Sequence, residues 1–311
     1  MNADALYLPP RAKLNLFLRI VGRRADGYHL LETLFHAIEL HDDLTVAPAR
    51  AGIQLRVTAD AGLVVPTGHD NLVVQALGNL AAAAGHAGGF DVHLHKRIPP
   101  GAGLGGGSSD AAAALRLGNE LLQRPFDGPQ LAQLAVALGA DVPFFLRSGS
   151  QWGRGIGDEL SPAVVEPQHF VLLLPPFGCP TAEVYKNYSA LWKCSPAQDK
   201  VPIAIPNTRD STVTVRLGND LERAAELVQP ALAGLRRRVV ESGHPDVRMT
   251  GSGSALFVAC ADEVAAARCE QSLAALPVAG VRIVRTRSAG SLDSPSRRPP
   301  GRGDPEPAPS G

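Results

Sequence analysis

The sequence predicts an α+β protein in which most strands pair in antiparallel fashion. Segments with strand and helix periodicity follow one another without the strict alternation that a parallel α/β sheet requires. Several strand segments alternate between apolar and polar residues, which is typical of strands with one face in water. The chain has 311 residues, of which 45% are hydrophobic and 19% charged, and this length accommodates two modest globular domains.

The first predicted strand covers residues 13–21. Its aliphatic side chains share the face that we expect to pack on the core: Leu14, Leu16, Leu18 and Ile20. Lys13 and Asn15 then project together from the opposite face. A helix follows later in the chain, with Asp70 as its expected N-cap and Ala84 as its last residue.

Residues 90–98 form the next predicted strand, and a helix extends from about Ser109 to Gln123. Alternating polarity over the strand indicates that one of its faces is in water. A shorter helix covers residues 130–138, where Gly139 is suited to the C-terminal end. Farther on, the proline at position 143 is expected to hold Val142 in an extended conformation.

The second half begins with a buried strand at residues 170–174. Helical periodicity over residues 221–240 is interrupted at Pro230, which predicts two helices or one kinked helix. Shorter elements complete this half: strands at 247–250 and 255–259, a helix beginning at Asp262, and a strand at 281–284. We expect an N-terminal domain over 1–165, a C-terminal domain over 166–288, and a disordered tail over 289–311. The tail is rich in Pro, Gly and Arg and cannot bury a core.

Composition excludes several classes of protein. The formal net charge is zero, so we expect no nucleic-acid partner, and any selectivity for anions must be local. The start of the chain lacks a secretion signal pattern and no apolar run approaches about 18 residues, so we expect a cytoplasmic protein without membrane association. The four cysteines have no Cys-x-x-Cys spacing and are interpreted as reduced thiols.

The most informative stretch is the glycine-rich run at residues 99–110, which lies between a predicted strand and a predicted helix. Closely spaced glycines let backbone N–H groups approach a ligand without hindrance from a Cβ atom. The first N–H groups of the helix are unpaired, and its positive dipole end points the same way. Together these features indicate phosphate binding, with Ser and Asp near the helix start as expected caps.

Other readings of this run are weaker. The spacing Gly101-x-Gly103-x-x-Gly106 matches the dinucleotide fingerprint, but the preceding segment alternates, whereas that fingerprint follows a fully buried parallel strand. A Walker A loop needs lysine before the serine, and Gly107 stands there. The accompanying motifs of a protein kinase do not occur. A flexible linker does not usually run directly into a helix.

The run closely resembles the Pro-x-x-x-Gly-Leu-Gly-Gly-Gly-Ser-Ser loop of the GHMP kinase superfamily, which includes galactokinase, homoserine kinase and mevalonate kinase. Further segments resemble this superfamily in the same order: residues 12–18, 24–29, 139–145 and 249–257. The resemblance implies two domains, the first like ribosomal protein S5 domain 2 and the second ferredoxin-like. It also implies ATP and Mg²⁺ as cofactors of a phosphotransferase.

The resemblance also implies roles for particular residues. Asp141 corresponds to the base that accepts a proton from the acceptor hydroxyl, and Lys13 is its partner. An ammonium close to a carboxylate favours the ionised carboxylate and stabilises developing negative charge. The residues implied to bind ATP are Pro99, Pro100, Gly101, Ala102, Gly103, Leu104, Gly105, Gly106, Gly107, Ser108 and Ser109. No ligand set for the metal is evident, and Asp110 is either a helix-start acid or a ligand.

Segments 24–29 and 139–145 are similar to the branch of the superfamily that acts in non-mevalonate isoprenoid synthesis. The implied partner is a small molecule, cytidine diphosphate methylerythritol, phosphorylated at its 2-hydroxyl. Tyr28 and Tyr185 would stack on cytosine and His29 would bind its edge. Two further residues are implied to face the substrate: Asn15 and Gly251. Three alternatives stay open: a homoserine or mevalonate type of kinase, a dinucleotide-dependent oxidoreductase, and a nucleotide sensor without transfer activity.

Overall fold

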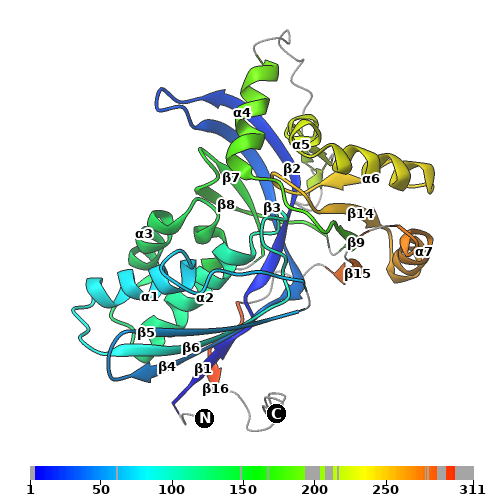
Figure 1. Ribbon diagram of the computed structural model, residues 1–311. Helices are drawn as coiled ribbons and strands as arrows, with labels where there is room; N and C mark the ends of the chain where they lie inside the picture. Colours follow the sequence, from blue (N-terminus) through cyan, green and yellow to red (C-terminus); the bar gives the residue numbers. More distant parts are fainter. Residues whose placement is uncertain are drawn as a thin grey trace.

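The computed structural model describes residues 4–60, 62–147, 149–166, 168–192, 204–206, 213–215, 217–276, 278, 280–285 and 292–297. Within these residues, three sheets of four or five strands and their covering helices build the fold (Figure 1). Most strand pairs are antiparallel, and parallel pairing joins β5 (Ile53–Ala59) to β6 (Gly89–Lys96) and β12 (Gly218–Asn219) to β2 (Arg11–Arg23). The predicted α+β class with mostly antiparallel sheets is confirmed.

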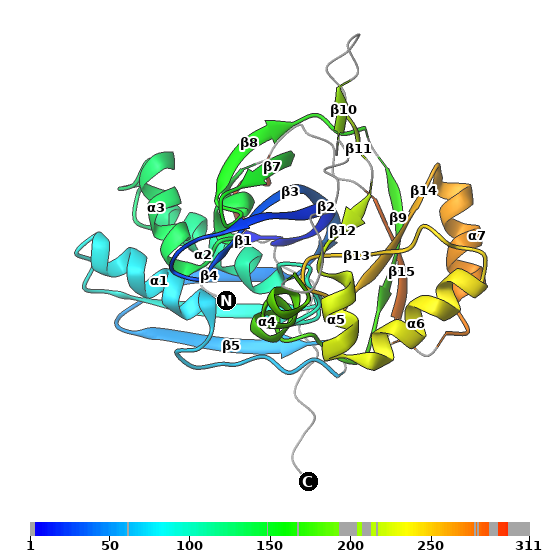
Figure 2. The ribbon, with the colours of Figure 1, turned by 90° about the horizontal axis from the view of Figure 1, so that it is seen from above.

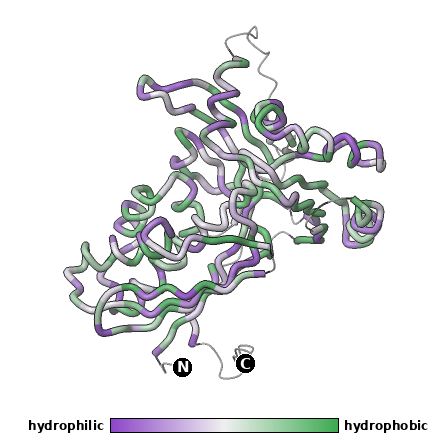
Figure 3. The backbone as a smooth tube through the Cα atoms, viewed as in Figure 1, coloured by the Kyte–Doolittle hydropathy of each residue, from purple (hydrophilic) through white to green (hydrophobic). Residues whose placement is uncertain are grey.

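The first sheet carries helices on one face. Its strands in spatial order are β16 (Ser296–Arg297), β1 (Leu6–Leu8), β4 (Asp43–Ala49), β6 and β5. The covering helices are α1 (Leu72–Ala83), α2 (Gly106–Leu121) and α3 (Gly128–Leu138). Phe90, Val92 and Leu94 of β6 point into the core beneath these helices, while His93 and His95 face outward. Figure 3 shows this alternation as green and purple segments along the strands.

The second sheet contains the longest strands. Its spatial order is β12, β2, β3 (His29–His41), β7 (Ser150–Arg154) and β8 (Glu159–Ala163). Strands β2 and β3 form an antiparallel ladder with three register irregularities, one of them between Asn15 and Phe17. Such irregularities bend a strand and redirect side chains. As a result Lys13, Asn15 and Phe17 are buried rather than exposed on an open face.

The third sheet belongs to the second half of the chain. Its antiparallel strands in spatial order are β13 (Arg248–Met249), β14 (Leu256–Cys260), β9 (His169–Leu174) and β15 (Gly280–Arg285). The nearby helices are α4 (Thr181–Trp192), α5 (Glu222–Val228), α6 (Pro230–Glu241) and α7 (Glu263–Leu273) (Figure 2). The predicted break at Pro230 is confirmed as the boundary between α5 and α6. The helix predicted from Asp262 is α7, which begins at Glu263 with Asp262 as its N-cap. A short separate hairpin pairs β10 (Ala204–Pro206) with β11 (Val213–Val215).

Strand β9 joins two cores because both of its faces are buried. Val171 and Leu173 pack with the helices of the second half. Phe170, Leu172 and Leu174 point the other way and pack with residues of β2 and β3. Burial of each such side chain contributes about 1.5–3 kcal/mol. This shared core holds the second half of the chain against the strand that carries Lys13.

Two predicted helix starts are wrong in detail. Helix α1 is capped by Asn71, not Asp70, and the Asn71 side chain accepts a hydrogen bond from the Val73 N–H at 2.9 Å. Helix α2 begins at Gly106, three residues earlier than predicted, so its first serines lie inside the helix and do not cap it. Gly105, with φ of 70°, is the capping residue and has no capping side chain.

Val142 is not extended, contrary to the prediction from the following proline. It is the first residue of a 3-10 helix, η1 (Val142–Leu146). Proline is tolerated in the first turn of a helix because its missing N–H is not needed there. The Val142 N–H bonds the Gly139 carbonyl at 3.1 Å, and burial of Val142 and Phe144 outweighs the local preference.

Part of the predicted disordered tail is ordered. Strand β16 pairs with β1, and the Asp293 carboxylate contacts the Arg11 guanidinium at 2.9 Å. Arg116 of α2 also donates to the Asp293 carbonyl at 2.5 Å. Salt bridges and one strand edge therefore hold residues 292–297 where apolar burial alone would not. The prediction for 289–291 and 298–311 lies outside the described residues, as does Cys194. The other three cysteines are free thiols.

Candidate active site

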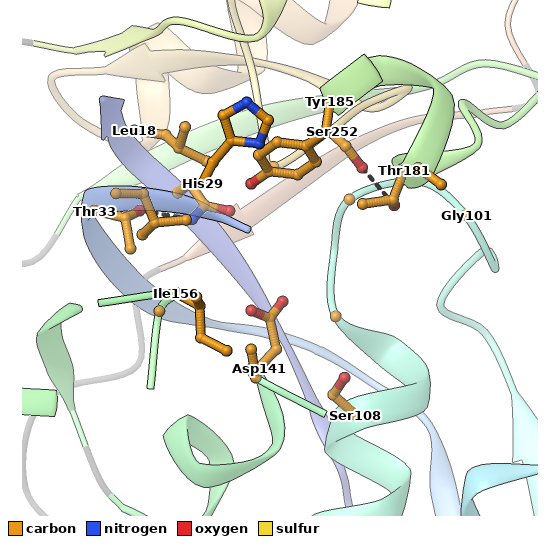
Figure 4. Close-up of a pocket in the computed structure, with 18 of the residues that line it drawn as sticks. Leu18, His29, Thr33, Gly101, Ser108, Asp141, Ile156, Thr181, Tyr185 and Ser252 are labelled. Atoms are coloured by element: carbon orange, nitrogen blue, oxygen red, sulfur yellow. Dashed lines mark hydrogen bonds between the residues drawn. The ribbon is translucent and has the colours of Figure 1, made fainter. Parts of the chain in front are cut away.

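A cavity of about 1030 Å³ lies between the glycine loop, the start of β3 and helix α4. Strand β2, residues 140–141 directly before helix η1, and a second glycine loop, residues 250–254, complete its walls. Of the site residues predicted from the sequence, all except Ser109 line this cavity. Figure 4 shows Ser108 at one end, His29 and Tyr185 at the other, and the Asp141 carboxylate directed between them.

The glycine loop is held by its carbonyl groups. Four successive carbonyl oxygens accept hydrogen bonds from outside the loop: Gly101 from Cys179 N (3.3 Å), Ala102 from Ala255 N (3.1 Å), Gly103 from Thr250 Oγ1 (3.3 Å) and Leu104 from Lys13 N (3.0 Å). In a trans peptide the N–H points opposite to the carbonyl of the preceding residue. The amides of residues 102–105 are therefore directed away from these anchors, which leaves them available to an anion in the cavity.

Gly103 is in contact with the second glycine loop. Its φ is 75°, and a Cβ atom there would lie 2.2 Å from the Thr250 carbonyl oxygen. The Thr250 hydroxyl also accepts the Asn15 N–H at 2.9 Å. Contacts through Thr250 thus connect the glycine loop, the second half of the chain and strand β2.

Lys13 and Asp141 form an ion pair in the middle of the cavity. Their Nζ and Oδ2 atoms are 3.5 Å apart, with the Lys13 side chain 4% exposed and that of Asp141 36% exposed. The Lys13 ammonium also donates to Asn15 Oδ1 and lies 5.5 Å from the centre of the Phe35 ring. Asn15 in turn donates to Thr33 Oγ1 at 2.7 Å. The lysine is therefore held from several sides, whereas the aspartate remains accessible to a substrate.

Burial lowers the pKa of Lys13, while the charge of Asp141 and its hydrogen bond act in the opposite direction. Little water surrounds the buried ammonium, so its electrostatic interaction with any charge that forms close by is weakly screened and therefore strong. Any negative charge that develops near Asp141 is therefore stabilised by Lys13.

Asp141 owes its position to helix η1. It is the N-cap residue of this helix, and the next three residues pack inward: Val142, Pro143 and Phe144. The Phe144 ring lies 5.1 Å from that of Phe35, the residue that also contacts Lys13. The same aromatic pair thus supports both members of the ion pair.

The aromatic residues predicted for the acceptor lie together at the far end of the cavity. The His29 and Tyr185 rings are 5.2 Å apart with an interplanar angle of 32°, and His29 Nε2 lies 2.9 Å from Ser189 Oγ. Burial and the charge of Arg23 lower the pKa of His29, which favours a neutral ring. Burial, with the negative charge of Asp141, raises the pKa of Tyr185, so its phenol is neutral too. Tyr28 is 62% exposed and presents an open ring face.

Sequence reasoning missed a contact across the cavity wall between Thr181 and Ser252. Their hydroxyl oxygens are 2.8 Å apart and join the start of α4 to the second glycine loop (Figure 4). Thr181 follows Pro180 at a helix start, a local signal that marks the helix but not its role. Phe35 and Thr33 were also missed, because nothing along β3 distinguishes wall residues from core residues.

Two residues at the loop exit do not face the cavity. Ser109 is 2% exposed and does not line it. Asp110 is also buried, and its Oδ2 atom lies 2.7 Å from Lys96 Nζ, so it is neither a simple helix-start acid nor a group directed at a metal in the cavity. The 3.6-residue turn of α2 rotates both side chains toward the sheet.

Within the described part of the chain, no group of three or more His, Cys, Asp and Glu side chains is arranged to hold a metal ion. His93 and His95 instead both contact the Thr58 hydroxyl, at 3.1 and 2.9 Å. None of the helices formed by the described residues has the length and apolar character needed to span a bilayer.

Comparison with known proteins places this geometry in a family. The model of the GHMP kinases N terminal domain matches residues 71–149. The 4-diphosphocytidyl-2-C-methyl-D-erythritol kinase of Moorella thermoacetica is 39% identical over 276 residues, which cover 85% of this chain and 93% of that protein. The protein of the same name from Pelotomaculum thermopropionicum is 40% identical over 255 residues, covering 81% and 88%.

Solved structures agree with these relatives. A crystal structure of 4-(cytidine 5'-diphospho)-2C-methyl-D-erythritol kinase matches with a TM-score of 0.73 and 34% identity, covering 92% of this chain and 100% of that one. A homoserine kinase from Cytophaga hutchinsonii shares the fold, with a TM-score of 0.61 and 16% identity over 94% of this chain and 97% of its own. The predicted GHMP kinase fold is confirmed, and the chain belongs to the 4-diphosphocytidyl-2-C-methyl-D-erythritol kinase family.

Proposed function

We propose that this protein transfers the γ-phosphoryl group of ATP to the 2-hydroxyl of 4-(cytidine 5'-diphospho)-2-C-methyl-D-erythritol. The observation that carries the proposal is the Lys13–Asp141 pair, which lies in one cavity between the glycine loop and the His29–Tyr185 aromatic cluster. A phosphate donor at one end and a nucleotide-linked alcohol at the other would meet at this pair. The ~40% identical relatives carry the name of this activity.

In the proposed reaction the acceptor hydroxyl oxygen attacks the γ-phosphorus atom. A new P–O bond forms, the bond from the γ-phosphorus to the β,γ-bridging oxygen breaks, and ADP leaves with that electron pair. The hydroxyl proton passes to the Asp141 carboxylate. Phosphoryl transfer depends on positioning and charge stabilisation more than on covalent help, and general base catalysis typically contributes about 10²–10⁴-fold.

Lys13 serves as the local positive charge in this proposal. Because its side chain is 4% exposed, its field is poorly screened, and its fixed position requires no reorganisation during the reaction. It stabilises the negative charge that develops on the transferring group. Asn15 orients the ammonium through its side-chain oxygen.

The glycine loop would bind the ATP phosphates through the amides of residues 102–105 and the start of α2. Mg²⁺ in such sites is held largely by phosphate oxygens and water with one or two protein oxygens, so a dense protein cluster is not needed. The Ser108 hydroxyl, on the cavity wall, fits that donor set. When bound, Mg²⁺ neutralises phosphate charge.

Tyr28, His29 and Tyr185 would select the cytidine part of the acceptor. A neutral His29 offers a donor or an acceptor to the base edge, and stacking on an aromatic ring contributes about 1–3 kcal/mol per base. We also propose that the catalytic unit divides into lobes at residues 1–165 and 166–288, with the cavity between them.

The direct test is ADP release in a coupled assay with ATP and Mg²⁺. The acceptors are the cytidine compound, methylerythritol phosphate, homoserine and mevalonate, supplied separately. We expect turnover with the cytidine compound alone. Turnover with a different alcohol would keep a GHMP kinase reaction but reject the acceptor assignment, and binding of ATP without ADP release from any acceptor would indicate a nucleotide sensor.

A further inference from the structure

A buried charged cluster lies beneath the glycine loop, outside the cavity. It consists of Lys96 at the end of β6, Asp42 between β3 and β4, and Asp110 in α2, with exposures of 2%, 0% and 3%. Lys96 Nζ donates to Asp42 Oδ2 and, at 2.7 Å, to Asp110 Oδ2. Burying charges has a large desolvation cost, and apolar residues of similar volume often stabilise a fold equally well. The cluster therefore calls for a role beyond simple stability.

The cluster is connected to both ends of the glycine loop. At the entry, Asp42 Oδ1 accepts the backbone N–H groups of Arg97 and Ile98, at 2.5 and 2.9 Å, directly before Pro99. At the exit, Asp110 lies one helical turn beyond Gly106, the first residue of α2. Lys96 joins the two carboxylates and so fixes the entry and exit relative to each other.

The contact with the loop is close. A Cβ atom on Gly106 would lie 3.2 Å from Lys96 Nζ and 2.8 Å from Ile98 Cγ2. Gly106 also lines the cavity, so a single glycine separates the ammonium from the phosphate-binding side. One ammonium faces two carboxylates, which means that the cluster carries no net positive charge to attract phosphate. Its effect on a ligand must therefore come through geometry.

We propose that Lys96, Asp42 and Asp110 form a positioning cluster that holds the glycine loop in its ATP-binding shape and thereby sets nucleotide affinity. This proposal rests on the function proposed above, in that the loop is taken to bind ATP phosphates. Misplacement of binding groups by about 1 Å can cost about 100-fold in rate. Hydrogen bonds that fix both ends of the loop should therefore have a measurable effect on how it binds a nucleotide. The three side chains act through the loop and do not touch the nucleotide.

Asp110 is the best position for a test because one of its oxygens is unengaged. Oδ1 is buried without a hydrogen-bond partner, and the groups that face this carboxyl are Lys96 from β6 and Asp42 from the β3–β4 turn. Asp110→Asn keeps an oxygen for Lys96 at nearly the same volume. Asp110→Ala removes the hydrogen bond between Lys96 and α2 while leaving the Lys96–Asp42 pair intact.

A matched control lies on the same helix. Asn119 is 7% exposed, and its side chain makes two hydrogen bonds with the Phe126 backbone: Nδ2 donates to the carbonyl at 3.0 Å and Oδ1 accepts the N–H at 3.1 Å. Asn119→Ala removes buried hydrogen bonds from α2 far from the glycine loop. A purely structural effect of helix destabilisation should appear in this variant as well.

The experiment measures ADP dissociation constants by calorimetry, KM for ATP and for the cytidine acceptor, and Tm, for the wild type and all three variants. We expect Asp110→Ala to weaken ADP binding and raise KM for ATP by about 10-fold, as for loss of one charge-assisted hydrogen bond, with KM for the acceptor unchanged. Asp110→Asn should stay within about 3-fold of the wild type, a difference below 1 kcal/mol. Asn119→Ala should lower Tm without changing nucleotide affinity.

The proposal is overturned if Asp110→Ala binds ADP as the wild type does, or if Asn119→Ala weakens binding equally. If Asp110→Ala does not fold, Asp110→Thr, which fills more of the space, takes its place with the same expected result. If the wild type does not phosphorylate the cytidine compound, the proposed function is rejected. The proposal on the positioning cluster is still decided in that case, because calorimetry with ADP needs no acceptor.

Discussion

Replacing Gly103 by alanine tests how closely the two glycine loops depend on each other. The residue has φ of 75°, a backbone conformation that costs an alanine about 1–2 kcal/mol. The added Cβ atom would also lie 2.2 Å from the Thr250 carbonyl oxygen, so one loop must move by about 1 Å to reach normal contact. That carbonyl belongs to the backbone and cannot rotate away as a side chain would.

The cost of that movement follows from the bonds it breaks. The Ala102 carbonyl accepts from Ala255 N at 3.1 Å, and the Gly103 carbonyl accepts from Thr250 Oγ1 at 3.3 Å. Losing both costs about 2 kcal/mol, at about 1 kcal/mol for each net hydrogen bond. With the backbone term, Gly103→Ala should destabilise the protein by about 3–4 kcal/mol, which lowers Tm by about 6–8 °C in a chain of this size.

Gly101→Ala is the matched control in the same loop. Gly101 has a similar φ of 68°, but the nearest atom to an added Cβ lies 3.9 Å away, at Gly178. It should therefore cost only the backbone term of about 1–2 kcal/mol. Urea unfolding and calorimetric Tm of both variants measure how much more Gly103→Ala destabilises the protein than Gly101→Ala does. We expect a difference in unfolding free energy of about 2 kcal/mol, which is the contribution of the contact between the two loops. Equal destabilisation by the two alanines would refute this reasoning.

Three further predictions concern charge and pH. Asp141→Asn should lower kcat by about 10²–10⁴-fold at saturating substrates. Its Tm should be nearly unchanged, because the Asp141 side chain of the ion pair with Lys13 is over a third exposed. ADP release at a rate near that of the wild type would contradict the assignment of Asp141 as the base. Burial lowers the pKa of His36 from 6.5 to about 4, so its stabilising contribution is present above pH 6.5 and is lost toward pH 4, by about 3 kcal/mol. Urea unfolding of His36→Gln at pH 7 and pH 4.5 should show a weaker acid loss than the wild type, and parallel losses would count against it. Burial, with the nearby carboxylate of Asp42, raises the pKa of Asp110 from 3.8 to about 7, so its contribution is full below pH 3.8 and disappears as pH rises through 7. Asp110→Asn should accordingly gain stability relative to the wild type between pH 4 and pH 8, by up to about 4 kcal/mol, and a pH-independent difference in unfolding free energy would exclude that shift.

Local patterns predicted element types well and element ends poorly. Pro230 divides two helices, as the missing N–H and rigid ring require, whatever surrounds it. The start of α2 was misplaced because serines inside a helix and serines at its cap look alike in sequence, whereas the left-handed Gly105 decides the start. Val142 adopts a 3-10 turn because burial of Val142 and Phe144 outweighs the preference imposed by the next residue.

Residues 292–297 also show that local sequence does not reveal contacts with distant parts of the chain. Their composition predicts disorder because they offer almost no apolar surface to bury. The structure orders them through Asp293, which meets Arg11 and Arg116, and through the free edge of β1. Such partners are distant in sequence, so composition within the segment carries no sign of them.

The sequence by itself determined the glycine loop and the family, because glycine spacing and short motifs encode local backbone geometry directly. It also predicted Lys13 and Asp141 as partners, through motifs that lie far apart along the chain. Only the tertiary structure decided that their charged atoms are 3.5 Å apart, that Asp110 turns away from the cavity to meet Lys96, and that Thr250 joins the two glycine loops. These facts depend on strand register, helix rotation and the shared core around β9, each of which is set by burial of many distant residues at once.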